Sequence, residues 1–132
     1  MNYLLDTHIA IWAIIRRERL PKRFAAVIND TSSRKYVSII SIWELAIKIN
    51  IGKLDFPGGT KGFIEILEHN GVEILPVSPA DVCQYATLPL HHRDPFDRIL
   101  IAAAIARDIA LLSCDENILP YVQNGLRILS HS

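Results

Sequence analysis

Short apolar runs rich in Val, Ile and Leu alternate along this chain with longer stretches in which apolar residues recur at helical spacing. The stretches predict helices, and the runs predict strands at residues 3–5, 36–40, 72–77, 110–113 and 126–129. The helices are expected near 7–15, 21–29, 42–51, 61–69, 79–87, 96–107 and 116–123. No repeat or linker interrupts the alternation. The pattern therefore predicts one α/β domain over residues 1–132, with a mostly parallel five-stranded sheet flanked by helices.

Two of the predicted helices begin with clear capping signals. Ser41 and Glu44 are spaced as in a capping box, with the serine as N-cap and the glutamate three residues later. Asp94 precedes a proline at the first helical position, and a second acid, Asp97, follows in the first turn. Residues 99–106 are almost wholly apolar, which predicts that this helix is buried on most of its circumference.

The composition is that of a globular protein, and the net charge indicates no partner. The 132 residues are 50% hydrophobic and 21% charged, and 14 Lys and Arg balance 14 Asp and Glu. No apolar run approaches the roughly 18 residues that a membrane span needs, and no secretory signal is recognised. Cys83 and Cys114 lack the spacing of a zinc site, so we expect reduced thiols and a cytoplasmic location.

Four acids are predicted to meet at one edge of the sheet. Asp6 ends the first strand, Asp115 follows the fourth, and Glu44 and Asp97 lie in the first turns of two helices. In a parallel α/β sheet, strand carboxyl ends and the N-termini of crossover helices share one edge, where ligands bind. Close carboxylates repel each other unless a cation lies between them, and Mg²⁺ or Mn²⁺ prefers oxygen ligands. Such an ion can polarise a phosphodiester and activate a bound water for in-line attack.

Each acid also has a structural explanation. Glu44 can serve only the capping box, and Asp94 is better explained as an N-cap than as a ligand. Asp97 can merely favour the helix dipole, and Asp115 can be a turn residue. Asp6 is the hardest to explain structurally, since a carboxylate that ends a buried strand has little reason to be there. The shared edge is therefore a stronger argument than any single acid.

Several segments of the chain, in order and at the expected spacing, match a known family. They are Leu4-Leu5-Asp6-Thr7-His8 with Trp12, Ser41 to Lys48 with Gly52-Lys53-Leu54, Leu88-Pro89, His92 to Arg98, Ile101-Ala102-Ala103 and Leu111 to Asp115. With these segments the chain resembles the PIN-domain family, and more closely the VapC-type toxin ribonucleases of bacterial type II toxin–antitoxin pairs. The resemblance covers most of the chain.

The resemblance implies a three-layer sandwich, usually homodimeric, that cleaves RNA and depends on Mg²⁺ or Mn²⁺. It assigns the catalytic and metal-binding acids to Asp6, Glu44, Asp97 and Asp115, the last being the least uniform position in the family. Thr7 matches a position that supports the site through its hydroxyl, and Asp94 is an additional acid ranked below the four.

Toxins of this type are inhibited by a small cognate antitoxin protein. We expect the apolar face of the first helices to form the groove for an antitoxin helix, with the residues Ile9, Trp12 and Ala13.

Contacts to RNA are predicted from the basic residues. The four site acids leave 10 acidic residues elsewhere against 14 basic ones, and a basic run is formed by Arg16, Arg17, Arg19, Lys22 and Arg23. Such a run can follow a phosphate backbone, although a solvated helix end explains it slightly better. Arg98 and Arg93 lie closer to the acids and are candidates to contact phosphates. His91 and His92 are better explained as loop histidines, and Trp12 and Trp43 as core or interface residues rather than base-stacking ones.

Three other functions fit parts of the pattern. An enzyme with an aspartyl-phosphate intermediate also has an Asp after its first strand, but His8 replaces the second acid that such chemistry usually needs. A non-catalytic RNA-binding module would be expected to lack one or more of the acids, and none is missing. A housekeeping RNA-processing nuclease of the same fold stays open, because the toxin assignment depends on an antitoxin gene.

Overall fold

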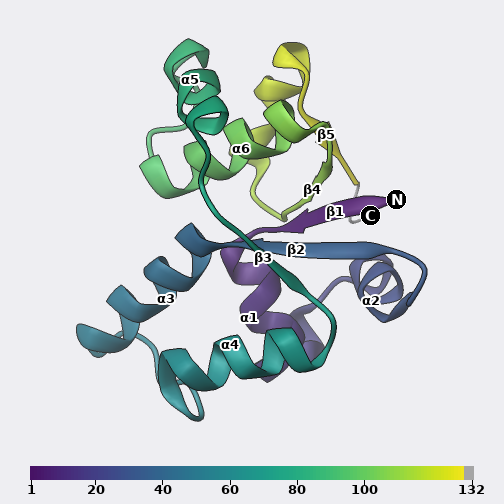
Figure 1. Cartoon of the computed structure of the whole chain (residues 1–132), viewed down its shortest axis with the longest axis vertical. Helices are drawn as coiled ribbons and strands as arrows, with labels where there is room; N and C mark the ends of the chain where they lie inside the picture. The colour runs from purple at the N-terminus through teal and green to yellow at the C-terminus, as the bar shows by residue number, and fades with distance from the viewer. Residues whose placement is uncertain (130–132) are drawn as a thin grey trace.

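A five-stranded parallel sheet runs through the middle of the computed structural model, which describes residues 1–129 (Figure 1). The strand order is β3-β2-β1-β4-β5, and every neighbouring pair is parallel. The strands are β1 (Asn2–Leu5), β2 (Arg34–Ser38), β3 (Glu73–Leu75), β4 (Ala110–Leu112) and β5 (Arg127–Ile128). The predicted five-stranded sheet is confirmed, and β1 lies at its centre.

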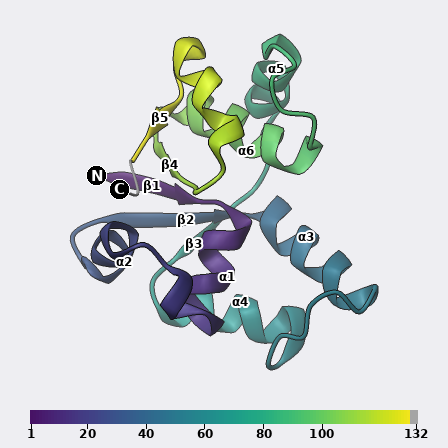
Figure 2. The same ribbon diagram turned by 180° about the vertical axis from the view of Figure 1, so that it is seen from behind.

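Helices cover both faces of this sheet, so the expected three-layer sandwich is confirmed (Figures 1 and 2). One face carries α1 (Thr7–Ile15), α2 (Lys22–Asn29), α3 (Ile39–Asn50) and α4 (Gly59–His69), with the short 3-10 helix η1 (Arg17–Arg19) between the first two. The other face carries α5 (Pro79–Thr87), α6 (Pro95–Arg107) and the 3-10 helix η2 (Glu116–Asn124). Tyr3 and Leu5 of β1 pack against the helices of the first face, and Leu4 packs against those of the second, because successive side chains of a strand point to opposite faces.

Helix α3 begins earlier than the sequence predicts. Ser38 is its N-cap, and its Oγ accepts a hydrogen bond of 3.1 Å from the backbone N–H of Ile40. The predicted strand 36–40 therefore ends at Ser38, and the predicted capping box of Ser41 and Glu44 is wrong, because both residues lie inside the helix. A capping box does occur at the start of α5, between Ser78 and Asp81.

The other differences are smaller. Strand β3 is shorter than the predicted 72–77 and ends before Pro76, which has no N–H for a strand ladder. The predicted helix at 116–123 is the 3-10 helix η2 and contains Pro120. Helix α6 is buried over most of its length, as predicted. Within residues 1–129, no helix is both long and apolar enough to cross a membrane.

Candidate active site

Three of the four predicted site acids line one cavity at the carboxyl edge of the sheet. The cavity has a volume of about 310 Å³, and its acidic wall consists of Asp6, Asp97 and Asp115. Asp6 follows β1, Asp115 lies beyond the end of β4, and Asp97 is in the first turn of α6. The rest of the wall is formed by His8, Ile9, Trp12 and Cys114. The parallel topology therefore brings these acids together from three separate segments.

Glu44, the fourth predicted acid, lies beside this cavity rather than in its wall. One carboxylate oxygen lies 2.8 Å from Thr7 Oγ1, and the other lies 3.2 Å from Lys48 Nζ. Because a carboxylate only accepts, Thr7 donates its proton to Glu44 and accepts from the Ser41 hydroxyl, which lies 2.8 Å away. Thr7 is buried and joins the start of α1 to α3. The expected support by the Thr7 hydroxyl thus has a geometric basis.

Several acids at this edge also cap helices. Asp6 is the N-cap of α1 and accepts a 2.8 Å hydrogen bond from Ile9 N–H, which is the structural role that local sequence reasoning missed. Asp115 caps η2 through Asn117 N–H at 2.9 Å. Asp94 caps α6, as predicted, and does not line the cavity. The caps fix Asp6 and Asp115 in position without neutralising their charge.

The electrostatics of the cavity favour a bound cation. Burial, together with the charges of Asp94, Glu44 and Asp6, raises the pKa of Asp97 to about 7. Burial also raises the pKa of Asp6. Burial opposes ionisation of Asp115 as well, but hydrogen bonds from Asn117 and His92 outweigh it and lower the pKa of that carboxyl. Ionising these carboxyls therefore requires free energy, and a bound divalent ion would reduce that penalty.

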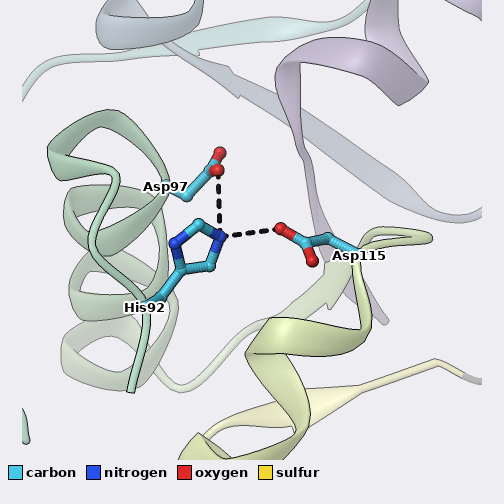
Figure 3. Close-up of side chains that lie close together, drawn as sticks. All are labelled: His92, Asp97 and Asp115. Atoms are coloured by element: carbon cyan, nitrogen blue, oxygen red, sulfur yellow. Dashed lines mark hydrogen bonds and ion pairs between the residues drawn. The ribbon is translucent and has the colours of Figure 1, made fainter. Parts of the chain in front are cut away.

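His92 completes this cluster, although the sequence predicts only a loop histidine there. Figure 3 shows its ring between two of the acids, with Nε2 at 2.7 Å from Asp115 Oδ2 and 3.2 Å from Asp97 Oδ2. The possible ligand atoms of these three side chains lie within 4.8 Å of one another. The local sequence does not show which of His91 and His92 faces the acids, because the partner Asp115 is distant in sequence. Carboxylates supply the oxygen donors that Mg²⁺ and Mn²⁺ prefer, so the residues fit the expected ion.

The prediction that Arg98 contacts phosphate is wrong. Its side chain is only 6% exposed, and its guanidinium donates to the carbonyl of Pro89 at 3.0 Å and to Tyr121 Oη at 3.1 Å. The guanidinium also lies over the ring of Tyr85, 4.7 Å from its centroid. Arg98 therefore holds the segment at 88–92 in place instead of facing RNA.

The other candidate cations are exposed. Arg93 lies on the loop that carries His92, close to the acids in sequence. Arg16 and Arg17 lie beyond the far end of α1, a helix length of roughly 13 Å from its N-cap Asp6. Arg17 also donates to the carbonyl of Ala13 at 2.9 Å, near the end of α1. The predicted basic run is therefore a separate surface from the acidic cavity.

A family model described as PIN domain matches residues 3–122. No match was found among curated proteins. Solved structures with the same fold include VapBC-1 from nontypeable Haemophilus influenzae, 17% identical with a TM-score of 0.72, covering 99% of this chain and 98% of that one.

Two further solved structures show the same likeness. VapBC2 from Rickettsia felis, bound to a DNA fragment from its promoter, is 18% identical with a TM-score of 0.71, and 98% of each chain is covered. VapBC-5 from Mycobacterium tuberculosis, a member of the VapBC family of toxin–antitoxin systems, is 17% identical with a TM-score of 0.64, and 97% of each chain is covered. At these identities the likeness shows the fold.

Proposed function

This chain belongs to the PIN domain family, and from that membership we propose that it is a metal-dependent endoribonuclease and the toxin of a toxin–antitoxin pair. The observation that carries the nuclease proposal is the convergence of Asp6, Asp97 and Asp115 on one cavity. The charge of Glu44 acts on the same cluster through Asp97. Like charges held together in this way destabilise a fold unless they bind a cation.

In this proposal the three cavity acids hold Mg²⁺ or Mn²⁺, with Glu44 as the fourth acid of the site. When bound, the ion would activate a water for attack on the phosphodiester and neutralise charge on the phosphate. Asp6 and Asp115 are already held by backbone donors at the starts of α1 and η2. Asp97, with a pKa of about 7, has to release its proton for a cation to bind, so cation binding and proton release are coupled there.

RNA is the proposed substrate, and the proposed hydrolysis breaks one phosphodiester bond. Arg93 is the exposed cation nearest in sequence to the site acids, and we assign it a contact with a flanking phosphate. Arg16 and Arg17 would contact the RNA backbone farther from the scissile bond. An unpaired segment fits this arrangement better than a duplex, because the acids lie at a cavity wall that a regular helix would reach poorly.

The proposed partner is a small antitoxin, acting in the cytoplasm with the toxin. A second cavity, of about 430 Å³, lies between α1, α2 and α4, and its apolar wall includes Ala13, Ile14, Ile28 and Ile66. An amphipathic antitoxin helix could place its apolar face there. This groove shares Ala13 with the predicted one, whereas Ile9 and Trp12 line the acidic cavity instead.

A homodimer is also proposed, on the strength of the resemblance. Ile39 and Trp43 are large apolar residues one helical turn apart on α3, and they are 43% and 57% exposed. A second copy of the chain would cover them. Light scattering on the purified protein gives its molar mass and so distinguishes a dimer from a monomer.

The experiment that tests the enzyme uses the purified, antitoxin-free protein and a fluorescently labelled single-stranded RNA. Cleavage is followed with Mn²⁺, with Mg²⁺ and with EDTA, for the wild type and for Asp6→Asn. Asp55→Asn serves as the matched control, because it removes the same charge from an exposed position. Metal-dependent cleavage that Asp6→Asn loses and Asp55→Asn keeps supports the proposal. Cleavage that persists in EDTA or in Asp6→Asn refutes the carboxylate mechanism.

A further inference from the structure

We propose that His92 is a positioning residue of the metal site, which donates a hydrogen bond from Nε2 to the carboxylate of Asp115, keeps the carboxylate of Asp97 close to the same nitrogen, and does not itself bind the ion. The inference rests on the proposed metal-dependent function and adds a residue to it. It follows from the contacts made by the two ring nitrogens and from the way in which the loop is built.

The ring proton of His92 lies on the nitrogen that faces the acids. The backbone N–H of Asp94 donates to His92 Nδ1 at 3.2 Å, so Nδ1 is an acceptor and the proton of the neutral ring lies on Nε2. Nε2 is the nitrogen that faces the carboxylate oxygens of Asp115 at 2.7 Å and Asp97 at 3.2 Å. Carboxylates accept, so Nε2 donates to Asp115, and the carboxylate of Asp97 lies in contact with the same nitrogen.

This arrangement is the reverse of a metal-ligating histidine. Such a ligand binds the ion through an unprotonated nitrogen and donates its other N–H to an acceptor. In this protein the other nitrogen of His92 faces an N–H donor, the amide of Asp94. The Asp94 side chain caps α6 through Phe96 N–H at 2.8 Å, so the amide that sets the proton position belongs to a fixed helix start.

The loop around His92 is held in place by hydrogen bonds to its backbone. Tyr121 is fully buried, and its Oη accepts from the N–H groups of His91 and His92 at 3.1 and 2.9 Å. The same hydroxyl donates to Pro89 O at 2.7 Å. Arg98 adds a hydrogen bond to the carbonyl of His92 at 3.3 Å. The imidazole, 10% exposed, is therefore oriented by bonds to the backbone on both sides of it.

The consequence concerns two carboxylates that repel each other. Asp115 is held by Asn117 N–H at one oxygen and by His92 at the other, while Asp97 Oδ2 approaches the same Nε2. The ring thus holds an acid of α6 near an acid of the β4–η2 connection. Without it we expect the two carboxylates to separate and the affinity for a divalent ion to fall by about 10–100-fold, as for other groups that orient metal ligands.

The test measures the dissociation constants for Mg²⁺ and Mn²⁺ by calorimetry in the absence of RNA. We expect His92→Ala to raise both constants by about tenfold or more, and His92→Gln to restore much of the affinity, because the glutamine amide can donate from a position close to Nε2. His91→Ala is the matched control and should bind as the wild type does. In ¹⁵N NMR of the wild-type ring, Nε2 should be protonated and Nδ1 not, with and without Mg²⁺.

The contrary results are distinct. A loss confined to Mn²⁺ that glutamine does not restore, with Nε2 deprotonated on ion binding, would make His92 a ligand and overturn the inference. Tighter binding in His92→Ala would make it a competitor of the ion and overturn it too, as would unchanged binding. If the wild type binds neither ion, the metal-dependent function itself fails and this inference fails with it.

Discussion

Replacing Asp97 by Asn should make the metal-free protein more stable, although it should also abolish cleavage. Burial and the neighbouring charges of Asp94, Glu44 and Asp6 raise the pKa of this carboxyl from 3.8 to about 7. At pH 8 the folded chain therefore holds a carboxylate where a neutral side chain would be more stable. Asparagine has a similar shape without the charge, so the substitution removes the repulsion and leaves the helix start intact.

The size of the effect follows from the difference between the two pKa values. The pKa rises by about three, and each pKa unit corresponds to roughly 1.4 kcal/mol, so the upper limit of the stability gain is about 4 kcal/mol. The side chain of Asp97 is 27% exposed, so water and salt screen part of this energy. We expect a gain of about 1–2 kcal/mol at pH 8, or roughly 3–8 °C in the melting temperature of a domain of this size.

The stability gain from Asp97→Asn should increase with pH. Because the folded-state pKa is raised, the unfolded chain loses this proton first, and the native wild type becomes less stable as the pH rises from about 4 to about 7. The gain from Asp97→Asn should therefore be largest at pH 8 and disappear near pH 4. Denaturant unfolding in EDTA at several pH values measures this, with Asp55→Asn as the control for loss of an exposed charge.

Two outcomes would refute this reasoning. One is a variant that is no more stable than the wild type at pH 8 in EDTA, and the other is a gain that does not change with pH. Saturating Mn²⁺ provides a further check, because an ion that binds the folded wild type stabilises it by mass action. The wild type should then gain more stability than the variant, and the difference between them should shrink or reverse.

Three further predictions concern other residues. Asp6→Asn should lose cleavage while its melting temperature is no lower than that of the wild type, because asparagine is also a good N-cap for α1 and removes a buried charge. Arg93→Ala should weaken RNA binding and reduce the slope of its salt dependence by about one, measured by fluorescence anisotropy at several salt concentrations. Arg98→Ala should lower the free energy of unfolding by about 2–4 kcal/mol in denaturant titrations, since it removes a buried donor to the carbonyls of Leu88 and His92 and leaves a cavity beside Tyr85.

Each of these has a result that contradicts it. Unfolding of Asp6→Asn would give that acid a structural role beyond capping, and an unchanged salt slope in Arg93→Ala would remove its phosphate contact. A stable Arg98→Ala with weakened RNA binding would reinstate Arg98 as a surface residue, against its observed burial.

Local patterns in the sequence determined the layers of the fold and which acids lie at the carboxyl edge of the sheet. Alternating apolar residues in β1 send Leu4 to one core and Leu5 to the other, and the almost wholly apolar run at residues 99–106 predicted the burial of α6. Because parallel strands end where their crossover helices begin, placing Asp6 after β1 and Asp97 at the start of α6 was enough to bring them to one edge.

Only the tertiary structure decided which partner each polar side chain has. Ser38 and Ser41 are both suitable caps locally, and the position at which β2 ends selected Ser38 and turned Glu44 towards Thr7. His92 meets Asp115, and Arg98 meets Tyr121, across 23 residues of chain in each case. The apolar pattern of a segment depends only on residues that are close in sequence. The hydrogen-bonding partners of a side chain depend on which distant segments the packed sheet and helices bring within about 3 Å of it.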